Sequence, residues 1–287
     1  MKKRLSMLLA ALLSVVIMFS ACAKNSNDAG NASKADSITD EDNTFKVGLE
    51  AGYPPFNWTQ LDDSNGAVKI QNGSEYAGGY DVEIAKIIAE SLGKELVIVK
   101  TEWNGLIPAL TSGKIDAIIA GMSPTDERKE SIDFTDNYYT SELVMVVKKG
   151  GKYDNATSIQ DFNGAKITAQ LNTFHYTVID QIEGVNKQTA MEDFPSMRVA
   201  LESGIIDGYI SERPEGISAQ AANSNFKMIE FAEGKGFETS PDDTAIAVGV
   251  RKGSELTQKI NEALAKISEE QRKELMDNAI MNQPAAE

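Results

Sequence analysis

One eleven-residue pattern occurs twice in this chain. The segment ALTSGKIDAII covers residues 109–119, and ALESGIIDGYI covers residues 200–210. Most positions of the two copies are identical, and Leu201 follows Leu110 by 91 residues. Each copy combines the end of a helix with the start of a strand, which is the building unit of α/β folds. The repeat therefore predicts two similarly built α/β halves in one chain.

The turn inside each copy is predicted to be structural. Gly113 and Gly204 stand where a helix ends, and a left-handed residue at that position is usually glycine. Asp116 and Asp207 follow the turn, and we expect their carboxylates to bond nearby backbone groups rather than a ligand. The repeated pattern is thus expected to build the scaffold.

Strands and helices alternate along the rest of the chain. The two prolines of AGYPPFNW argue against a regular element in that segment. The alternation is typical of a parallel-rich α/β sheet. We predict strands at FKVGLE, ELVIVKT, IDAIIAG, AKITAQ, KQTAM and IDGYI, and helices at DVEIAKIIAESLG, GLIPALTSG, PTDERKE, TFHYTVIDQI, FPSMRVALESG and RPEGISAQAA.

Two apolar runs, SELVMVVKKG and TAIAVGVRKG, each end in basic residues and a glycine. We interpret them as two strands that cross between the halves, one outward and one back. The final segment, SELTQKINEALAKISEEQRKELM, has the spacing of one long helix. It is predicted to close the first half, which would make that half discontinuous in sequence.

The N-terminus has the pattern of a bacterial secretory signal. A basic start precedes an apolar run that ends at Phe19, which is typical of a signal peptide and short for a membrane-spanning helix. Cys22 is the only cysteine, and it follows two small residues as in a bacterial lipobox. We expect a signal peptide at 1–21 and lipidation of Cys22. The polar composition of residues 22–44 predicts a flexible tether.

The chain is acidic, with a formal net charge of −15 at pH 7. Removal of the basic signal peptide would make the charge still more negative. This balance argues against nucleic acid and against a polybasic membrane contact. His175 is the only histidine, so no ligand set for a transition metal is expected, and no cofactor is predicted.

The segments that follow the two repeated patterns differ in chemistry. Ligands of open α/β sheets bind beyond the carboxyl ends of strands. The first copy leads to Gly121, Met122 and Ser123, which offer backbone N–H groups and a hydroxyl. The second copy leads to the carboxylate of Glu212. One end suits an anion and the other a cation, which predicts a zwitterionic ligand between the halves.

Arg128 is predicted to strengthen the anion-binding end. Thr125 is the predicted N-cap of the PTDERKE helix, and a helix N-terminus favours a carboxylate or a phosphate. Arg128 follows one turn later and can donate two parallel hydrogen bonds to a carboxylate. In the alternative interpretation, Arg128 is a surface arginine paired with Asp126 or Glu130.

The run YPPF…GYDVEIAKIIAESLG…W…LIPALTSGKIDAIIAGMSPTDERKESIDFTDNYY resembles the family 3 solute-binding proteins, the polar amino-acid receptors of ABC importers. The resemblance extends from Phe45 to the end of the chain, although Asn137 replaces the family's usual proline. It implies the fold of type II periplasmic binding proteins, in which two Rossmann-like α/β lobes are joined by two hinge strands and close on the ligand. Lobe 1 would comprise residues 45–142 and 246–287, and lobe 2 residues 143–245.

The resemblance also implies roles for individual residues. Arg128 would bind the α-carboxylate of the ligand with help from Gly121 and Ser123. Thr173 would meet the same carboxylate from lobe 2. Glu212, at a position where the family usually has aspartate, would bind the α-ammonium.

The residues expected to select the ligand side chain lie in the first half of the chain. Tyr53 matches the aromatic residue that stacks on the ligand side chain, and Trp103 is a further cleft aromatic. Glu50 ends the first strand, where relatives that bind basic or amide side chains often have an acidic residue. Charge and cation–π contacts would favour lysine, arginine, ornithine or histidine, and glutamine remains the alternative. His175 is either a cleft residue or a supporting one.

These features predict a non-enzymatic, monomeric receptor for a free, cationic L-amino acid. It would be lipid-anchored at the outer face of the bacterial cytoplasmic membrane and would deliver its ligand to the transmembrane subunits of an ABC permease. One alternative is an enzyme similar to cyclohexadienyl dehydratases, with Glu212 as acid or base. The other is a tethered amino-acid sensor that reports to a separate receptor.

Overall fold

The computed structural model describes residues 43–284 of the 287-residue chain. The predicted signal peptide, Cys22 and nearly all of the predicted tether lie outside the described residues. Within the described part, no helix is both long and apolar enough to cross a membrane.

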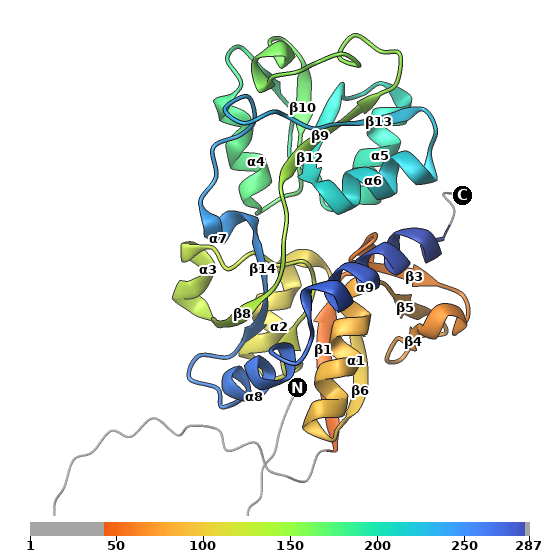
Figure 1. The fold of residues 1–287 in the computed structure, drawn as a ribbon, viewed down its shortest axis with the longest axis vertical. Helices are drawn as coiled ribbons and strands as arrows, with labels where there is room; N and C mark the ends of the chain where they lie inside the picture. Colours follow the sequence, from red (N-terminus) through yellow and green to blue (C-terminus); the bar gives the residue numbers. More distant parts are fainter. Residues whose placement is uncertain (1–42, 285–287) are drawn as a thin grey trace, which may run out of the picture. The chain divides into compact units, whose positions relative to one another are not determined.

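The first half of the chain forms a five-stranded sheet around β1 (Thr44–Leu49). β1 is parallel to β6 (Glu95–Lys100) and to β7 (Ala117–Ile118). The late strand β14 (Ala245–Val250) is antiparallel and lies between β7 and β8 (Asp133–Thr140). We call this sheet and its helices lobe 1 (Figure 1). The helices are α1 (Tyr80–Leu92), α2 (Leu106–Thr111), α3 (Asp126–Ser131), α8 (Leu256–Leu264) and α9 (Glu269–Asn282).

The middle of the chain forms a second five-stranded sheet, which we call lobe 2 together with its helices (Figure 1). β10 (Lys166–Thr168) lies between β11 (Asn186–Lys187) and β12 (Gly208–Glu212) and is parallel to both. β9 (Leu143–Lys148) is antiparallel to β12 and to β13 (Phe226–Ile229). The helices of lobe 2 are α4 (Phe174–Val178), α5 (Phe194–Ser203) and α6 (Arg213–Ala222).

Most of each apolar run lies within one sheet, although the first run begins at the crossing itself. β9 belongs to the second sheet and β14 to the first. The chain crosses at Ser141 and Glu142, and it returns through the segment that contains α7 (Pro241–Thr244). A strand covered on both faces is apolar along its whole length, which explains why the runs continue from the crossings into inner strands of the two sheets. Short 3₁₀ helices lie at η1 (Ser64–Gly66), η2 (Trp103–Gly105), η3 (Ile159–Phe162) and η4 (Ile179–Gln181).

The repeated pattern builds the same corner in both lobes, as predicted. Both of its glycines are left-handed, with φ values of 77° and 75°. Asp116 accepts a hydrogen bond from the Lys46 backbone N–H at 3.0 Å, and Asp207 accepts one from the Lys166 N–H at 2.8 Å. Each bond ties the start of a central strand to the neighbouring strand. The structural role expected for these two aspartates is therefore confirmed.

A small antiparallel sheet after β1 was missed by the sequence analysis. β2 (Gly52–Tyr53) and β3 (Asn57–Gln60) form a hairpin around Pro54 and Pro55, which are joined by a cis peptide bond. The expectation that the prolines prevent a regular element was wrong, because both prolines occupy the turn and leave the flanking strands free to pair. The sheet is completed by β5 (Tyr76–Gly78) and β4 (Val68–Lys69).

The predicted long C-terminal helix is two helices, α8 and α9. The Ser268 hydroxyl accepts a hydrogen bond from the Gln271 backbone N–H, and the Gln271 side chain accepts one from the Ser268 N–H. This reciprocal pair is a capping box that starts a new helix. Both helices contact α1, so the C-terminal segment packs on lobe 1.

A buried polar network joins α1 to the end of β7. The Tyr138 hydroxyl donates to Asp81 Oδ1 at 2.7 Å and accepts from the Gly121 backbone N–H at 3.1 Å. Asn57 donates to the second carboxyl oxygen of Asp81 at 2.8 Å. Burial raises the pKa of Asp81 to about 7. One tyrosine hydroxyl therefore fixes the backbone that follows the first repeated pattern.

Replacing Tyr138 with phenylalanine is expected to lower the free energy of unfolding by about 2 kcal/mol. The variant leaves a buried carboxyl oxygen and a buried N–H without partners, and such orphaned groups are costly. Urea unfolding measures the change. Tyr76→Phe is the matched control, because the Tyr76 hydroxyl makes no hydrogen bond among the described residues. Equal stability of the two variants would contradict the prediction.

Candidate functional site

A small cavity lies where loops of lobe 1 meet loops of lobe 2. Its free volume is about 10 Å³, which is close to the least that holds one water molecule. The two lobes therefore meet closely around it. The lining residues are Tyr53, Trp103, Gly121, Ser123 and Arg128 from lobe 1, and Gln170, Thr173, Phe174 and His175 from lobe 2.

Arg128 is the cation of this cavity. The Thr125 hydroxyl caps α3 by accepting from the Arg128 backbone N–H, as predicted. The Arg128 guanidinium donates to the Ser123 carbonyl at 2.9 Å and to the Asn172 carbonyl at 3.1 Å. Its Cζ lies 5.0 Å from the centre of the Trp103 ring. Burial lowers the pKa of Arg128 to about 10, so the group stays charged at neutral pH.

The backbone that follows β7 is held on several sides. Gly121 has a φ of 62°, and a Cβ at this position would lie 2.8 Å from the Tyr53 ring. The Ser123 hydroxyl donates to the Asp243 carbonyl at 2.9 Å. Met122 is buried in the core of lobe 1, and its carbonyl accepts from the Ala247 N–H at 3.1 Å.

Glu50 follows β1 and reaches across to lobe 2. Its Oε2 accepts a hydrogen bond from Gln170 Nε2 at 3.0 Å, and Gln170 also donates to the Glu192 carbonyl. Glu50 Oε1 is buried and has no hydrogen-bond partner among the described residues. Burial raises the pKa of Glu50 to about 8, and the nearby Asp193 adds to the increase. This carboxyl group is therefore largely neutral at pH 7.

Tyr53 is fixed by stacking on both lobes. Its ring lies 4.8 Å from the ring of Phe56 and 4.2 Å from the ring of Phe194, measured between centroids. Phe194 begins α5 in lobe 2. The Tyr53 hydroxyl is buried without a hydrogen-bond partner in the described part of the chain. The aromatic wall of the site is thus shared between the lobes.

Lobe 2 contributes the turn before α4. Asn172 is left-handed, with a φ of 56°, and its side chain donates to Asn104 Oδ1 at 2.8 Å. The Thr173 hydroxyl donates to the Gln170 carbonyl at 2.7 Å. This turn therefore carries both an inter-lobe hydrogen bond and the Asn172 carbonyl that accepts from the guanidinium.

Glu212 ends β12 and lies beside His175. Glu212 Oε1 is 3.0 Å from His175 Nε2, and both side chains are buried. Burial raises the pKa of Glu212 to about 8. Burial, together with the charge of Arg128, lowers the pKa of His175 to about 3. Neither group therefore carries a full charge at neutral pH.

The predicted site residues either line the small cavity, contact residues that line it, or pack in the core of lobe 1. Glu50 and Glu212 do not line the cavity but contact residues that do, and Met122 packs in the core. The nitrogen atoms of Arg128 meet carbonyl groups instead of Asp126 or Glu130. Gln170, Phe174 and Phe194 were not predicted. Gln170 and Phe174 lie close to the predicted Thr173 in sequence, whereas no sequence signal marks Phe194. The predicted residues that line the cavity are Tyr53, Trp103, Gly121, Ser123, Arg128 and Thr173.

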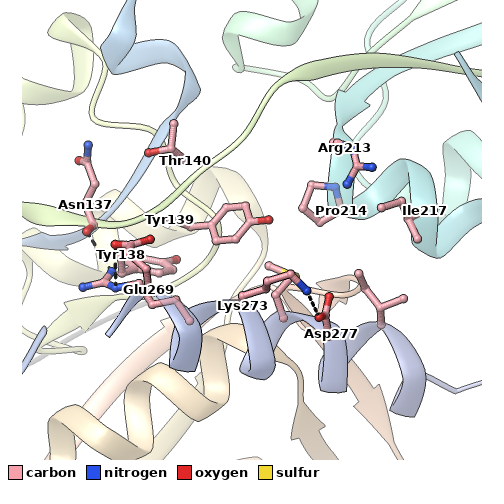
Figure 2. A pocket seen from close by; sticks show the side chains of 13 residues that line it. Asn137, Tyr138, Tyr139, Thr140, Arg213, Pro214, Ile217, Glu269, Lys273 and Asp277 are labelled. Carbon is pink, nitrogen blue, oxygen red and sulfur yellow. Dashed lines mark hydrogen bonds and ion pairs between the residues drawn. The ribbon is translucent and has the colours of Figure 1, made fainter. Parts of the chain in front are cut away.

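A larger cavity of about 320 Å³ lies between α6 and α9, beside the end of β8 (Figure 2). Its charged side chains already have partners: Lys273 pairs with Asp277, Arg213 pairs with Glu230, and Arg272 donates to backbone carbonyls. No residue lines both cavities. The small cavity is the candidate site, because it combines a partly buried cation with two adjacent buried carboxyl groups.

Comparison with known proteins gives the family of this two-lobed structure. Residues 45–280 match the model of the bacterial extracellular solute-binding proteins, family 3. The chain belongs to this family. Its members are solute-binding proteins rather than enzymes, and the dehydratase-like alternative is therefore set aside.

Relatives of this solute-binding protein include several named for basic amino acids. A "Probable histidine-binding protein" of Campylobacter jejuni is 35% identical over 189 residues, which are 66% of either chain. The arginine-binding extracellular protein ArtP of Bacillus subtilis is 32% identical over 60% of this chain and 57% of its own length. The matched segments thus span just under two thirds or less of these two relatives.

A solved structure supports the fold of the family 3 protein. The amino acid ABC transporter substrate-binding protein AbpA of Streptococcus pneumoniae, bound to L-arginine, matches with a TM-score of 0.70 at 26% identity. The match covers 83% of this chain and 95% of AbpA. The predicted type II periplasmic-binding-protein fold is confirmed.

Glu50→Gln is expected to stabilise the protein at pH 8 by about 4 kcal/mol and to leave its stability at pH 4.5 nearly unchanged. The folded-state pKa of Glu50 is raised from 4.5 to about 8. The stability that the neutral carboxyl supports is complete below pH 4.5 and is lost as the pH rises towards 8. Glutamine cannot ionise and still accepts a hydrogen bond from Gln170.

Thermal and urea unfolding at pH 4.5 and pH 8 test this prediction. Glu102→Gln, at an exposed acid close to the site, is the control and is expected to show little pH-dependent difference from wild type. If Glu50→Gln fails to gain stability relative to wild type at the higher pH, Glu50 does not titrate as described.

Proposed function

We propose that this protein binds a free cationic amino acid (lysine, arginine, ornithine or histidine) between its two lobes. The observation that supports this proposal best is a partly buried arginine and two buried glutamates around one cavity that both lobes line. A basic amino acid has the complementary groups, since it carries a carboxylate, an α-ammonium and a basic side chain. The larger cavity between α6 and α9 lacks this combination of one guanidinium and two buried carboxyl groups.

Each group of the ligand is proposed to have its own partner. The α-carboxylate binds the Arg128 guanidinium, together with the backbone near Gly121 and the hydroxyls of Ser123 and Thr173. The α-ammonium is met from lobe 2, on the side of Glu212. The basic side chain extends past Tyr53 and Trp103 towards Glu50, which becomes ionised when a cation approaches it.

Binding is proposed to be coupled to closure of the lobes. Contacts between the lobes surround the site: Glu50 with Gln170, Arg128 with Asn172, and the ring of Tyr53 with that of Phe194. A ligand that bridges both lobes favours the closed arrangement, because it binds that arrangement more tightly. We propose that lobe 2, residues 143–245, moves relative to residues 45–142 and 246–287.

The cellular setting is also a proposal. The signal peptide at 1–21 and the lipobox-like Cys22 support export and lipid anchoring at the outer face of the cytoplasmic membrane. The likeness to an ABC transporter substrate-binding protein supports delivery of the amino acid to the membrane subunits of an ABC permease.

Glutamine is the second candidate ligand. The raised pKa of Glu50 means that an uncharged carboxyl group faces the side-chain end of the site at neutral pH, and a neutral carboxyl can exchange hydrogen bonds with an amide. The choice between a cationic and an amide side chain therefore depends on whether Glu50 ionises on binding.

Replacing Arg128 with alanine is expected to weaken binding of arginine about 100-fold or more, because it removes the charge partner of the α-carboxylate. Isothermal titration calorimetry measures the loss, and circular dichroism verifies the fold. Arg213→Ala is the control, since Arg213 is half-exposed and lines the other cavity. Undiminished affinity of the Arg128 variant would overturn the site assignment.

Glu50→Gln is expected to weaken binding of arginine and lysine about 10- to 100-fold, the range of a lost charge-assisted hydrogen bond. Glutamine binding should change less than threefold. A thermal-shift screen of the amino acids followed by calorimetry measures this selectivity, with Glu102→Gln as the control. Equal loss for all ligands, or none for arginine, would refute the cationic specificity.

A further inference from the structure

His175 stands between Glu212 and the candidate site. His175 lines the small cavity, whereas Glu212 does not. The two side chains come from different elements of lobe 2, His175 from α4 and Glu212 from the end of β12. Their closest polar atoms, Nε2 and Oε1, are 3.0 Å apart, and the side chains are only 6% and 2% exposed. Any ligand group directed at Glu212 therefore approaches the imidazole as well.

Several polar atoms of the His175–Glu212 pair lack hydrogen-bond partners in the described part of the protein. Glu212 Oε2 and both ring nitrogens of His175 are buried and have no hydrogen-bond partner among the described residues, although Nε2 lies 3.0 Å from Glu212 Oε1. Buried polar atoms are rarely left without partners, because their desolvation is otherwise uncompensated. The pair thus has capacity for one more donor group. An ammonium has three N–H donors and no acceptor.

The electrostatic setting keeps the imidazole neutral. Arg128 lines the same cavity, and its charge acts together with burial against protonation of His175. A neutral imidazole has one N–H donor and one nitrogen acceptor. Once the approach of an ammonium ionises Glu212, a proton on Nε2, 3.0 Å from Glu212 Oε1, leaves Nδ1 as the acceptor. An orienting partner of this kind commonly fixes the tautomer of a histidine.

The position of His175 relative to Arg128 fits one part of the ligand. The carboxylate and the ammonium of an α-amino acid are attached to the same carbon. A group that receives the ammonium must therefore lie close to the group that receives the carboxylate. His175 and Arg128 line one cavity of about 10 Å³, so they meet this requirement.

We propose that His175 and Glu212 form one recognition unit for the α-ammonium of the ligand. His175 contacts the ammonium, and Glu212 positions the imidazole and supplies the balancing carboxyl group. This inference rests on the proposed function, because it assumes an α-amino acid in the small cavity. It adds a specificity-determining residue, His175, and makes Glu212 its positioning partner.

The test compares arginine with δ-guanidinovalerate, which is arginine without its α-ammonium. Wild-type protein is expected to bind arginine at least tenfold more tightly than the analogue. His175→Phe keeps the ring bulk but removes both nitrogen atoms, and it should reduce this preference to less than threefold. Calorimetry measures the affinity for arginine, and competition with arginine measures the affinity for the analogue. If His175 acts in packing alone, the variant binds both ligands more weakly by the same factor, and this result would overturn the proposal.

Two further variants keep the test decisive. If His175→Phe does not fold, as judged by circular dichroism, then His175→Asn and His175→Gln replace it, because each retains an amide near one ring nitrogen. The double variant His175→Phe, Glu212→Gln should lose no more preference for arginine than the stronger single variant. Additive losses would mean that the two residues do not act as one unit.

The outcomes also separate this inference from the proposed function. If wild-type protein binds none of the tested amino acids, the proposed function fails. If it binds arginine and discriminates against the analogue, and His175→Phe retains that discrimination, the proposed function stands and the role of His175 is wrong.

Discussion

The site depends on the hydrogen bonds that the Arg128 guanidinium makes to both lobes. It is held within lobe 1 by the Ser123 carbonyl and reaches the Asn172 carbonyl of lobe 2. A partly buried cation needs such partners, because its desolvation would otherwise be uncompensated. The charge also acts on its surroundings, since it helps to keep His175 neutral. One side chain therefore joins the lobes and determines the electrostatics of the cavity between them.

The two buried carboxyl groups near the site, unlike the Arg128 guanidinium, are held in a largely neutral form. Glu50 and Glu212 are almost fully buried, yet no lysine or arginine among the described residues forms an ion pair with either, and the His175 imidazole beside Glu212 is neutral. Their raised pKa values follow from burial. Residues chosen for stability alone would be uncharged at these two positions. Such a cost is expected at sites that must bind a charged ligand, where function and stability oppose each other.

The elements with regular local patterns were predicted well. Helical spacing identified α1, α5 and α6, and the repeated pattern correctly assigned Asp116 and Asp207 to the scaffold. The small sheet was missed because its strands are very short, and the break between α8 and α9 was missed because a capping box interrupts an unbroken helical spacing. The two apolar runs did not reveal that β9 lies in the second sheet and β14 in the first, since an apolar run does not show which sheet contains it.

The same distinction between local and distant information applies to the site. Residues at strand ends and helix starts, such as Gly121, Ser123 and Arg128, could be found from the chain because their positions follow from local structure. Gln170 and Phe194 could not, since their importance depends on side chains more than a hundred residues away, Glu50 and Tyr53. Single-sequence patterns carry no information on which side chains the closed lobes bring together.

The two halves of the repeat explain how one scaffold presents opposite chemistry on its two sides. In lobe 1, the chain after the repeat needs glycine at position 121 to pass the Tyr53 ring, and it then caps α3 with Thr125, which positions Arg128. In lobe 2, Glu212 stands at the N-cap of α6, but its side chain makes no capping hydrogen bond. The carboxyl group is consequently available to His175. Matching corners thus orient the strands, and the capping choice just beyond each corner decides whether a cation or a carboxyl group stands at that strand end.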